Sequence, residues 1–265
     1  KKTAFQTFCS AIAGSGSSME RDYSSEGRLF FNDLPNPRST GKLAGIRAVD
    51  RLNPQRPPTG SYPVLFDERI SNSLISHLMS AINGASISRG SSWLRDKLGK
   101  KILPNNITLT ENPLRPRIAG SRPFDGEGLP TSQKNFIENG VLKHFVLDLR
   151  SARKLKLKPL GNAYRSLSSA PQPGVGNLEL SPGNQTAMEL IKNMKQGLVV
   201  TSMIGSTINQ NTGDYSRGAN GFWVENGEVV FPVNECTIAG NLKEMLLNII
   251  VANDGKAHLS RVIPS

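Results

Sequence analysis

Apolar residues at intervals of three and four predict amphipathic helices in two parts of the chain. Asp67 is a good N-cap for the first helix, which Gly84 would close. Its apolar face would consist of Ile70, Leu74, Ile75, Leu78, Met79 and Ile82. The second helix would begin after the N-cap Asn241 and end near Gly255. Its apolar face would consist of Leu242, Met245, Leu246, Ile249 and Ile250. Further helical patterns cover residues 41–52, 91–99, 150–158 and 186–196.

Two Asn-Gly pairs predict β-hairpins, because a type I′ turn needs positive φ at both central positions. Asn226-Gly227 separates strands rich in aromatic and β-branched residues, and Asn139-Gly140 turns a second hairpin within residues 136–147. Other strands are expected on both sides of a loop that begins at residue 14, and over 62–66, 107–109, 176–180 and 198–203. Hairpins interspersed with helices indicate an α+β fold with a mainly antiparallel sheet. Residues 1–60 would be a central segment of strands and a helix that leads into a main domain of residues 61–265.

Composition is that of an ordinary globular protein. The chain has 265 residues, of which 37% are hydrophobic and 20% charged, and no apolar run is long enough to cross a bilayer. Cys9 and Cys236 fit a reducing cytoplasm better than a disulfide scaffold, although one bridge stays possible. No secretory signal follows Lys1 and Lys2. The first residues alternate as if a strand were entered in its middle, which indicates a fragment whose natural N-terminal part is missing.

The net charge of +11 raises the possibility of nucleic-acid binding. The densest basic cluster is residues 150–158, RSARKLKLK, where an ordinary solvated helix surface is the favoured interpretation. Aromatic residues make up only 6% of the chain and do not interleave with basic residues as in RNA-binding signatures. The excess charge could also match an acidic surface on another chain.

The histidines do not have the spacing of a zinc peptidase. An H-E-x-x-H site needs two histidines one helical turn apart and a glutamate beside the first. The chain has three histidines, His77, His144 and His258, and none has a second histidine three to five residues on. Leu78 follows His77, and Ala81 stands one turn later. His77 is therefore interpreted as a helix-surface or core-edge residue.

Three pairs of residues are candidates for contact with a peptide or a partner. Asp125 and Glu127 lie in the loop FDGEGLPT and could bind a cation or an amine, or simply form a turn. Asp214 and Arg217 lie in GDYSRGANG, where they could face a substrate or could form a local ion pair that holds a tight turn. The third pair is Phe222 and Trp223, which face opposite sides of a strand, so that one is expected in the core and the other exposed.

Several segments together resemble the TldD/PmbA family, specifically the C-terminal part of its PmbA (TldE) branch. In chain order they are MERDY (19–23), TGSYPVLFD (59–67), FDGEGLPT (124–131), GNAYRS (161–166), GDYSRGANGFWVENGEVVFPV (213–233) and TIAGNLKEML (237–246). The resemblance covers essentially the whole chain and implies that residues 61–265 form the family's C-terminal domain. It also implies that a preceding region of the family is absent here.

In that family a TldD-like subunit carries an H-E-x-x-x-H helix and zinc, and pairs with a PmbA-like subunit in a cytosolic peptidase that acts on small or unfolded peptides. The helix around Ser76-His77-Leu78 offers neither the glutamate nor the paired histidine. The resemblance therefore implies a non-catalytic subunit with no zinc and no other cofactor of its own, whose partner is a zinc-bearing TldD-like chain. Without that partner a homodimer is possible, and a membrane partner is not expected.

Two alternatives remain open at this stage. One is a nucleic-acid-binding protein, suggested by the charge and by the description of family members as modulators of DNA gyrase. The other is a self-sufficient hydrolase with an unconventional site around Asp125, Glu127 and Asp214.

Overall fold

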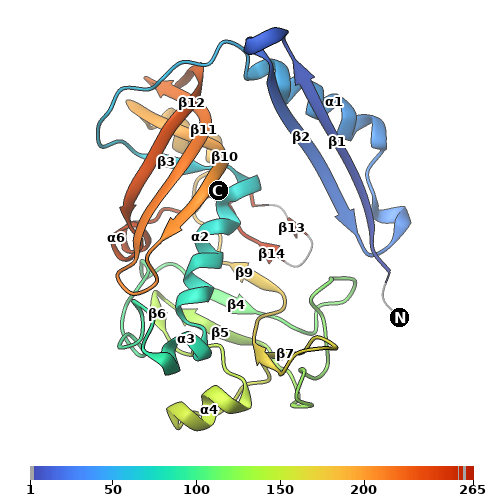
Figure 1. Cartoon of the computed structure of the whole chain (residues 1–265), viewed down its shortest axis with the longest axis vertical. Helices are drawn as coiled ribbons and strands as arrows, with labels where there is room; N and C mark the ends of the chain where they lie inside the picture. Colours follow the sequence, from blue (N-terminus) through green and yellow to red (C-terminus); the bar gives the residue numbers. More distant parts are fainter. Residues whose placement is uncertain (1–2, 256, 259–260) are drawn as a thin grey trace. The chain divides into compact units, whose positions relative to one another are not determined.

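The computed structural model of the chain describes residues 3–255, 257–258 and 261–265, except for the side chains at 206–207, 257–258 and 261 (Figure 1). The α-helices are α1 (Pro37–Asp50), α2 (Glu68–Ala81), α3 (Gly84–Arg89), α4 (Leu149–Leu155), α5 (Ala187–Lys192) and α6 (Leu242–Leu247). The strands are β1 (Phe5–Ala13), β2 (Glu20–Arg28), β3 (Val64–Phe66), β4 (Leu109–Glu111), β5 (Lys134–Glu138), β6 (Val141–Leu142), β7 (Ala163–Tyr164), β8 (Gln172–Pro173), β9 (Leu178–Leu180), β10 (Gln196–Ile208), β11 (Asp214–Glu225), β12 (Glu228–Asn241), β13 (Ala257–His258) and β14 (Arg261–Val262).

Contacts divide the chain into two compact units, each built from three segments. Unit 1 comprises Lys1–Ile70, Ala187–Gly205 and Gly218–Thr237, and unit 2 comprises Ser71–Thr186, Ser206–Arg217 and Ile238–Ser265. The domain boundary that the sequence predicts at residue 60 stays a prediction. Helices and mainly antiparallel sheets occur together, so the α+β prediction is confirmed. No helix in the described part of the chain has the length and apolar character needed to cross a bilayer.

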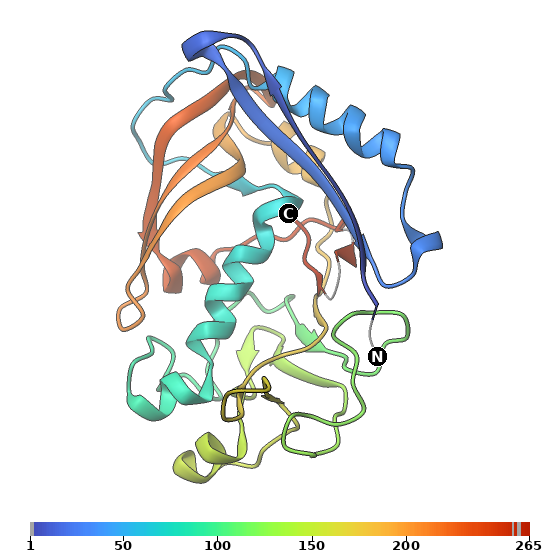
Figure 2. The same ribbon diagram turned by 45° about the vertical axis from the view of Figure 1, so that its right-hand side comes forward.

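Unit 1 begins with a two-stranded ribbon covered by a helix. β1 and β2 pair antiparallel along their whole length, and α1 runs beside them in both Figures 1 and 2. The helix turns small residues inward, since Thr40, Ala44 and Ala48 are buried. Larger apolar residues of α1 are exposed instead, with Ile46 at 46% and Val49 at 56%.

Unit 1 also contains the predicted Asn-Gly hairpin between β11 and β12. Asn226 and Gly227 have φ of 51° and 82°, as a type I′ turn requires, so this prediction is confirmed. The strands belong to a sheet of order β12-β11-β10-β3, in which β3 runs parallel to β10. Gly221 fits against β10 only because it lacks a side chain, since a Cβ there would lie 1.8 Å from the carbonyl oxygen of Val199.

Unit 2 contains a six-stranded sheet of order β13-β14-β9-β4-β5-β6. Its hairpin between β5 and β6 turns on Asn139 and Gly140, with φ of 49° and 77°, as predicted. α2 is also confirmed: it follows Asp67, whose Oδ1 accepts a hydrogen bond from the backbone N–H of Arg69 at 3.0 Å. The apolar residues Leu74, Ile75, Leu78 and Met79 of this helix are buried.

A carboxylate is completely buried at the end of β4. Glu111 is 0% exposed, and its Oε2 lies 3.0 Å from the Nζ of Lys134, which is 9% exposed. The same Oε2 accepts a hydrogen bond from Asn162 Nδ2 at 2.7 Å, and Oε1 accepts one from the backbone N–H of Gly176 at 2.5 Å. The buried charge is therefore both paired and hydrogen-bonded, as burial of a charge requires.

Two helix predictions are wrong. Residues 91–99 form turns, and the helix of this region is α3, which is capped by Asn83 and ends at Gly90 in a left-handed conformation. Gly84 therefore begins a helix. α6 ends at Leu247, because the chain beyond it extends and Ala252 forms a bridge with Gln185. Ile250, an apolar position of the predicted helix, is 69% exposed.

Candidate functional site

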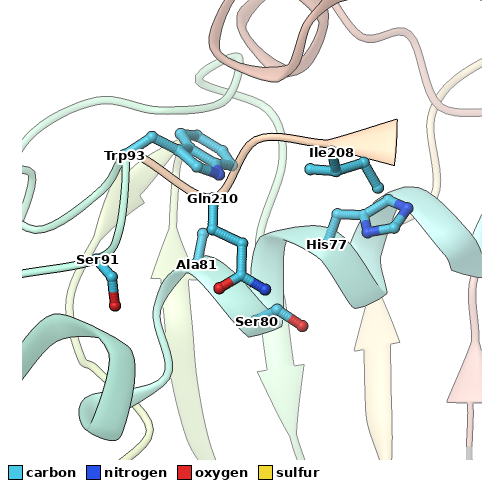
Figure 3. A pocket seen from close by; sticks show the side chains of 7 residues that line it. All are labelled: His77, Ser80, Ala81, Ser91, Trp93, Ile208 and Gln210. Carbon is cyan, nitrogen blue, oxygen red and sulfur yellow. The ribbon is translucent and has the colours of Figure 1, made fainter. Parts of the chain in front are cut away.

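A pocket of about 210 Å³ opens within unit 2, beside the C-terminal half of α2 (Figure 3). Three segments supply its wall: α2, the turn after α3, and the end of β10 with the loop that follows it. The lining residues are His77, Ser80, Ala81, Ser91, Trp93, Ile208 and Gln210. Of these seven residues, only His77 is considered as a possible ligand from the sequence alone.

Local hydrogen bonds fix the two segments that face α2. Ser92 Oγ donates to the carbonyl oxygen of Ala81 at 2.5 Å and accepts from the N–H of Leu94 at 3.0 Å, so the turn is tied to the end of the helix. The backbone N–H of Trp93 donates to the carbonyl oxygen of Gln210 at 3.0 Å. These bonds place the indole of Trp93 and the carboxamide of Gln210 on the same pocket (Figure 3).

His77 supplies one wall of this pocket, and its surroundings favour the neutral form of its imidazole. Burial lowers the pKa of its imidazole below the ordinary 6.5, and the positive charge of Arg217 lowers it further. The ring meets the ring of buried Tyr215 edge-on, with centroids 6.0 Å apart. Its Nε2 atom is buried and has no hydrogen-bond partner among the described residues.

The residues around His77 do not fit a zinc centre of the H-E-x-x-x-H kind. That motif, begun at His77, would place its glutamate at position 78 and its second histidine at position 82. Those positions hold Leu78 and Ile82, and both side chains are 0% exposed in the core. In the described part of the chain, no group of three or more His, Cys, Asp or Glu residues could hold a metal ion. The side chain of His258 lies outside the described ones.

Asp125 and Glu127 both accept hydrogen bonds from backbone N–H groups, some of them in distant segments. Asp125 is 4% exposed, and its Oδ1 accepts hydrogen bonds from the N–H groups of Glu127 and Leu129, each at 2.9 Å. Its Oδ2 accepts a third from the N–H of Ala163 at 2.9 Å. Glu127 Oε2 accepts from the N–H of Leu149 at 2.8 Å, at the start of α4. Asp125 therefore stabilises a turn, Glu127 connects this loop to the start of α4, and the binding of a cation or an amine by this pair stays a prediction.

Asp214 and Arg217 lie at the start of β11 and make separate contacts. Asp214 is exposed, and hydrogen bonds from Thr212 and Asn241 lower the pKa of its carboxyl group. Their distances are 2.5 Å from Thr212 Oγ1 and 2.9 Å from Asn241 Nδ2. Arg217 instead lies close enough to His77 to lower its pKa. Of the six candidate residues, two are thus connected with the pocket: Arg217 acts electrostatically on His77, and the carbonyl oxygen of Asp214 accepts a hydrogen bond at 2.9 Å from the N–H of Asn209, between the lining residues Ile208 and Gln210.

The structure settles which of the two adjacent aromatic residues is in the core. Trp223 is 1% exposed and meets Tyr62 edge-on at a centroid distance of 4.9 Å. Its indole Nε1 donates to Glu225 Oε1 at 3.0 Å. Phe222 is half-buried and packs against a cluster that includes Val224. A partner or peptide contact at this pair stays a prediction, and Phe222 is the member with surface to offer.

The basic residues of the segment 150–158 are all exposed. They comprise Arg150, Arg153, Lys154, Lys156 and Lys158. α4 begins at a capping box in which Asp148 Oδ1 accepts from the N–H of Ser151, and its buried side is formed by Ser151 and Ala152. The five cations form no ion pair with any carboxylate in the described ranges.

The sequence is similar to a known family and to several of its curated members. Residues 59–265 match the model of the PmbA/TldA metallopeptidase C-terminal domain. Metalloprotease PmbA of Escherichia coli O157:H7 is 41% identical over 244 residues, which cover 92% of this chain and 52% of that protein. A Metalloprotease PmbA homolog of Haemophilus influenzae is 39% identical over 257 residues, covering 96% and 54%. The chain spans about half the length of the curated relatives it matches.

A solved structure from Bacteroides thetaiotaomicron, described as a modulator of DNA gyrase, has the same fold. It superposes with a TM-score of 0.89 at 29% identity, covering 98% of this chain and 57% of that one. The sequence resemblance and the fold prediction are therefore both confirmed. The chain belongs to the TldD/PmbA family of metallopeptidases, in its PmbA branch, and the part it matches is the C-terminal domain.

Proposed function

We propose that the protein is a non-catalytic subunit of a TldD/PmbA-type metallopeptidase complex in the cytoplasm. Its partner would be a TldD-like subunit that binds the catalytic zinc, and the complex would cleave small or unfolded peptides. The observation that carries this proposal is on α2 and at the residue that follows it. His77 is followed by two apolar core residues, Leu78 and Ile82, at the positions where the zinc motif needs ionisable ones.

The role of this subunit would be to complete the peptide-binding chamber. β12 is an edge strand of its sheet, and outside its bridge with Gln55 at Pro232 and Val233 its outer backbone groups can pair with an extended peptide through main-chain hydrogen bonds. Such pairing needs little sequence specificity, which suits an enzyme for unfolded peptides. The exposed side chains of Val229 and Val230 on this strand add apolar contact surface.

The test measures zinc content and peptide cleavage for the full-length protein that contains this chain. We expect neither stoichiometric zinc nor cleavage from the purified protein alone, and cleavage when a family member with an intact H-E-x-x-x-H motif is added. A matched pair of variants, His77→Ala and His144→Ala, separates a ligand from an ordinary histidine. Zinc and cleavage by the protein alone, lost in H77A and kept in H144A, would overturn the proposal.

Nucleic-acid binding is the second candidate function, and the basic segment 150–158 is the observation that favours it. Five exposed cations that have no carboxylate partner among the described residues attract a polyanion, and the affinity for nucleic acid would then fall steeply with salt. Titration of DNA and RNA at several salt concentrations tests this directly. Absence of binding at low salt removes this candidate and leaves the first proposal unaffected.

A further inference from the structure

The size of the pocket beside α2 limits what it can hold. Its volume of about 210 Å³ is below the roughly 300–1,000 Å³ of sites for drug-sized molecules. It exceeds the roughly 150 Å³ of an engineered cavity that binds benzene. The pocket therefore has room for one amino-acid side chain.

Hydrogen-bonding groups dominate the wall of the pocket. Five of its seven lining side chains carry such a group, and Ala81 and Ile208 are the exceptions. Trp93 is 8% exposed, and its indole N–H has no hydrogen-bond partner among the described residues. Figure 3 shows the indole nitrogen turned toward the side of the pocket where Gln210 lies. The carboxamide of Gln210 and the two serine hydroxyls can each donate and accept.

The charge of the lining selects against ionised ligands. No lining residue is a carboxylate, lysine or arginine, and the lowered pKa of His77 favours its neutral imidazole. The nearby Arg217 is not part of the wall, and its side chain is hydrogen-bonded to Tyr215. An ammonium group would be repelled by the positive charge of Arg217, and a carboxylate would find no cation within the lining itself to pair with. A purely apolar side chain would leave the indole N–H unpaired.

An uncharged group that both donates and accepts hydrogen bonds fits these conditions. We propose that the pocket binds the carboxamide side chain of a glutamine or asparagine in a bound peptide. The carbonyl oxygen of the carboxamide accepts from the indole N–H of Trp93, and its NH₂ group donates to Gln210 or a serine hydroxyl. This inference rests on the proposed function for the source of the ligand, a peptide substrate.

Three small probes of similar shape test the proposal: the N-acetyl amides of glutamine, glutamate and leucine. Binding to the isotopically labelled protein is followed by NMR at the two indole N–H groups. Trp223 serves as the internal control, because its N–H is bonded to Glu225. We expect the glutamine probe to shift the Trp93 signal with a Kd on the order of 1 mM. The glutamate and leucine probes should bind at least about fivefold more weakly than the glutamine probe.

Paired variants separate the proposed hydrogen bond from general effects on the fold. Trp93→Phe keeps an aromatic wall but removes the N–H donor, and should weaken the glutamine probe about fivefold, as followed at the side-chain NH₂ signals of the lining residue Gln210. Trp223→Phe is the matched control and should leave its affinity unchanged. Equal affinity for the three probes, or equal shifts at both indoles, would overturn the proposal.

The full-length complex distinguishes this inference from the proposed function. If the single protein binds the probe but a zinc-bearing partner produces no cleavage, the proposed function is wrong and the selectivity of the pocket is still supported. If the complex cleaves peptides but the pocket shows no preference for carboxamides, the proposed function is supported and the inference about the pocket is wrong. If the partner alone abolished probe binding, the occupant would be a segment of that partner, and the peptide proposal would be wrong.

Discussion

The buried pair of Glu111 and Lys134 predicts a large and specific loss of stability. The substitution Lys134→Met removes the ammonium group that lies 3.0 Å from a carboxylate with no exposed surface. The hydrogen bonds from Asn162 and Gly176 remain, but the negative charge stays buried without a counter-ion. Breaking one partner of a buried ion pair costs about 3–5 kcal/mol in the free energy of unfolding.

A second substitution should recover part of that loss. In the double variant Glu111→Gln, Lys134→Met no charge is buried, but the new amide NH₂ would face the NH₂ of Asn162. The Oδ1 of Asn162 has no partner among the described residues, so its carboxamide can rotate and accept a hydrogen bond from the new amide at position 111, with loss of its 3.5 Å hydrogen bond to the carbonyl oxygen of Gly174. We expect the double variant to be more stable than Lys134→Met alone, by about 2 kcal/mol.

Urea-induced unfolding followed by circular dichroism measures these free energies. Lys143→Met is the control, because Lys143 forms an exposed pair with Glu138 at 3.5 Å and should lose no more than about 1 kcal/mol. A loss below about 1 kcal/mol in Lys134→Met, or no recovery in the double variant, would refute the reasoning.

Three other predictions concern α2, a strand glycine and a histidine. Leu78→Glu should lower the unfolding free energy by several kcal/mol in urea titrations, because it buries a charge without a partner, whereas Ser80→Glu on the exposed side should have little effect. Gly221→Ala should be strongly destabilising in thermal melts, since its Cβ would overlap a neighbouring carbonyl, while Gly45→Ala in open space should stabilise by about 0.5–1 kcal/mol. NMR titration should give His77 a pKa below 6.5. Because the unfolded chain then binds more protons, the contribution of His77 to the free energy of unfolding is complete above pH 6.5 and is lost as the pH falls through the lowered pKa. A pKa at or above 6.5 would contradict it.

Elements fixed by local chemistry could be predicted from the sequence, and those fixed by distant contacts could not. The Asn226-Gly227 turn depends on the φ preferences of two adjacent residues, and the structure shows both at positive φ. The end of α6 depends instead on a bridge between Ala252 and Gln185. The apolar spacing continues past Leu247, but nothing in the spacing shows that the chain leaves the helix there.

The candidate site shows the same division. The lack of a second zinc ligand near His77 is a matter of sequence spacing, and could be established without a structure. The pocket wall forms only when the N–H of Trp93 reaches the carbonyl oxygen of Gln210, a contact between distant parts of the chain. Asp125 is a candidate from the sequence because carboxylates near glycine can bind ligands, but only the structure shows three backbone N–H groups already bonded to it.

The two tryptophans of the chain also give each compact unit its own fluorescent reporter. Trp223 belongs to unit 1 and Trp93 to unit 2, and both are buried in the fold. Each therefore moves from protein to water when its unit unfolds, and a Trp→Phe change at one site leaves the emission of the other. Unfolding curves of the two single-tryptophan proteins would coincide if the units melt as one cooperative body, and would separate if either can open alone.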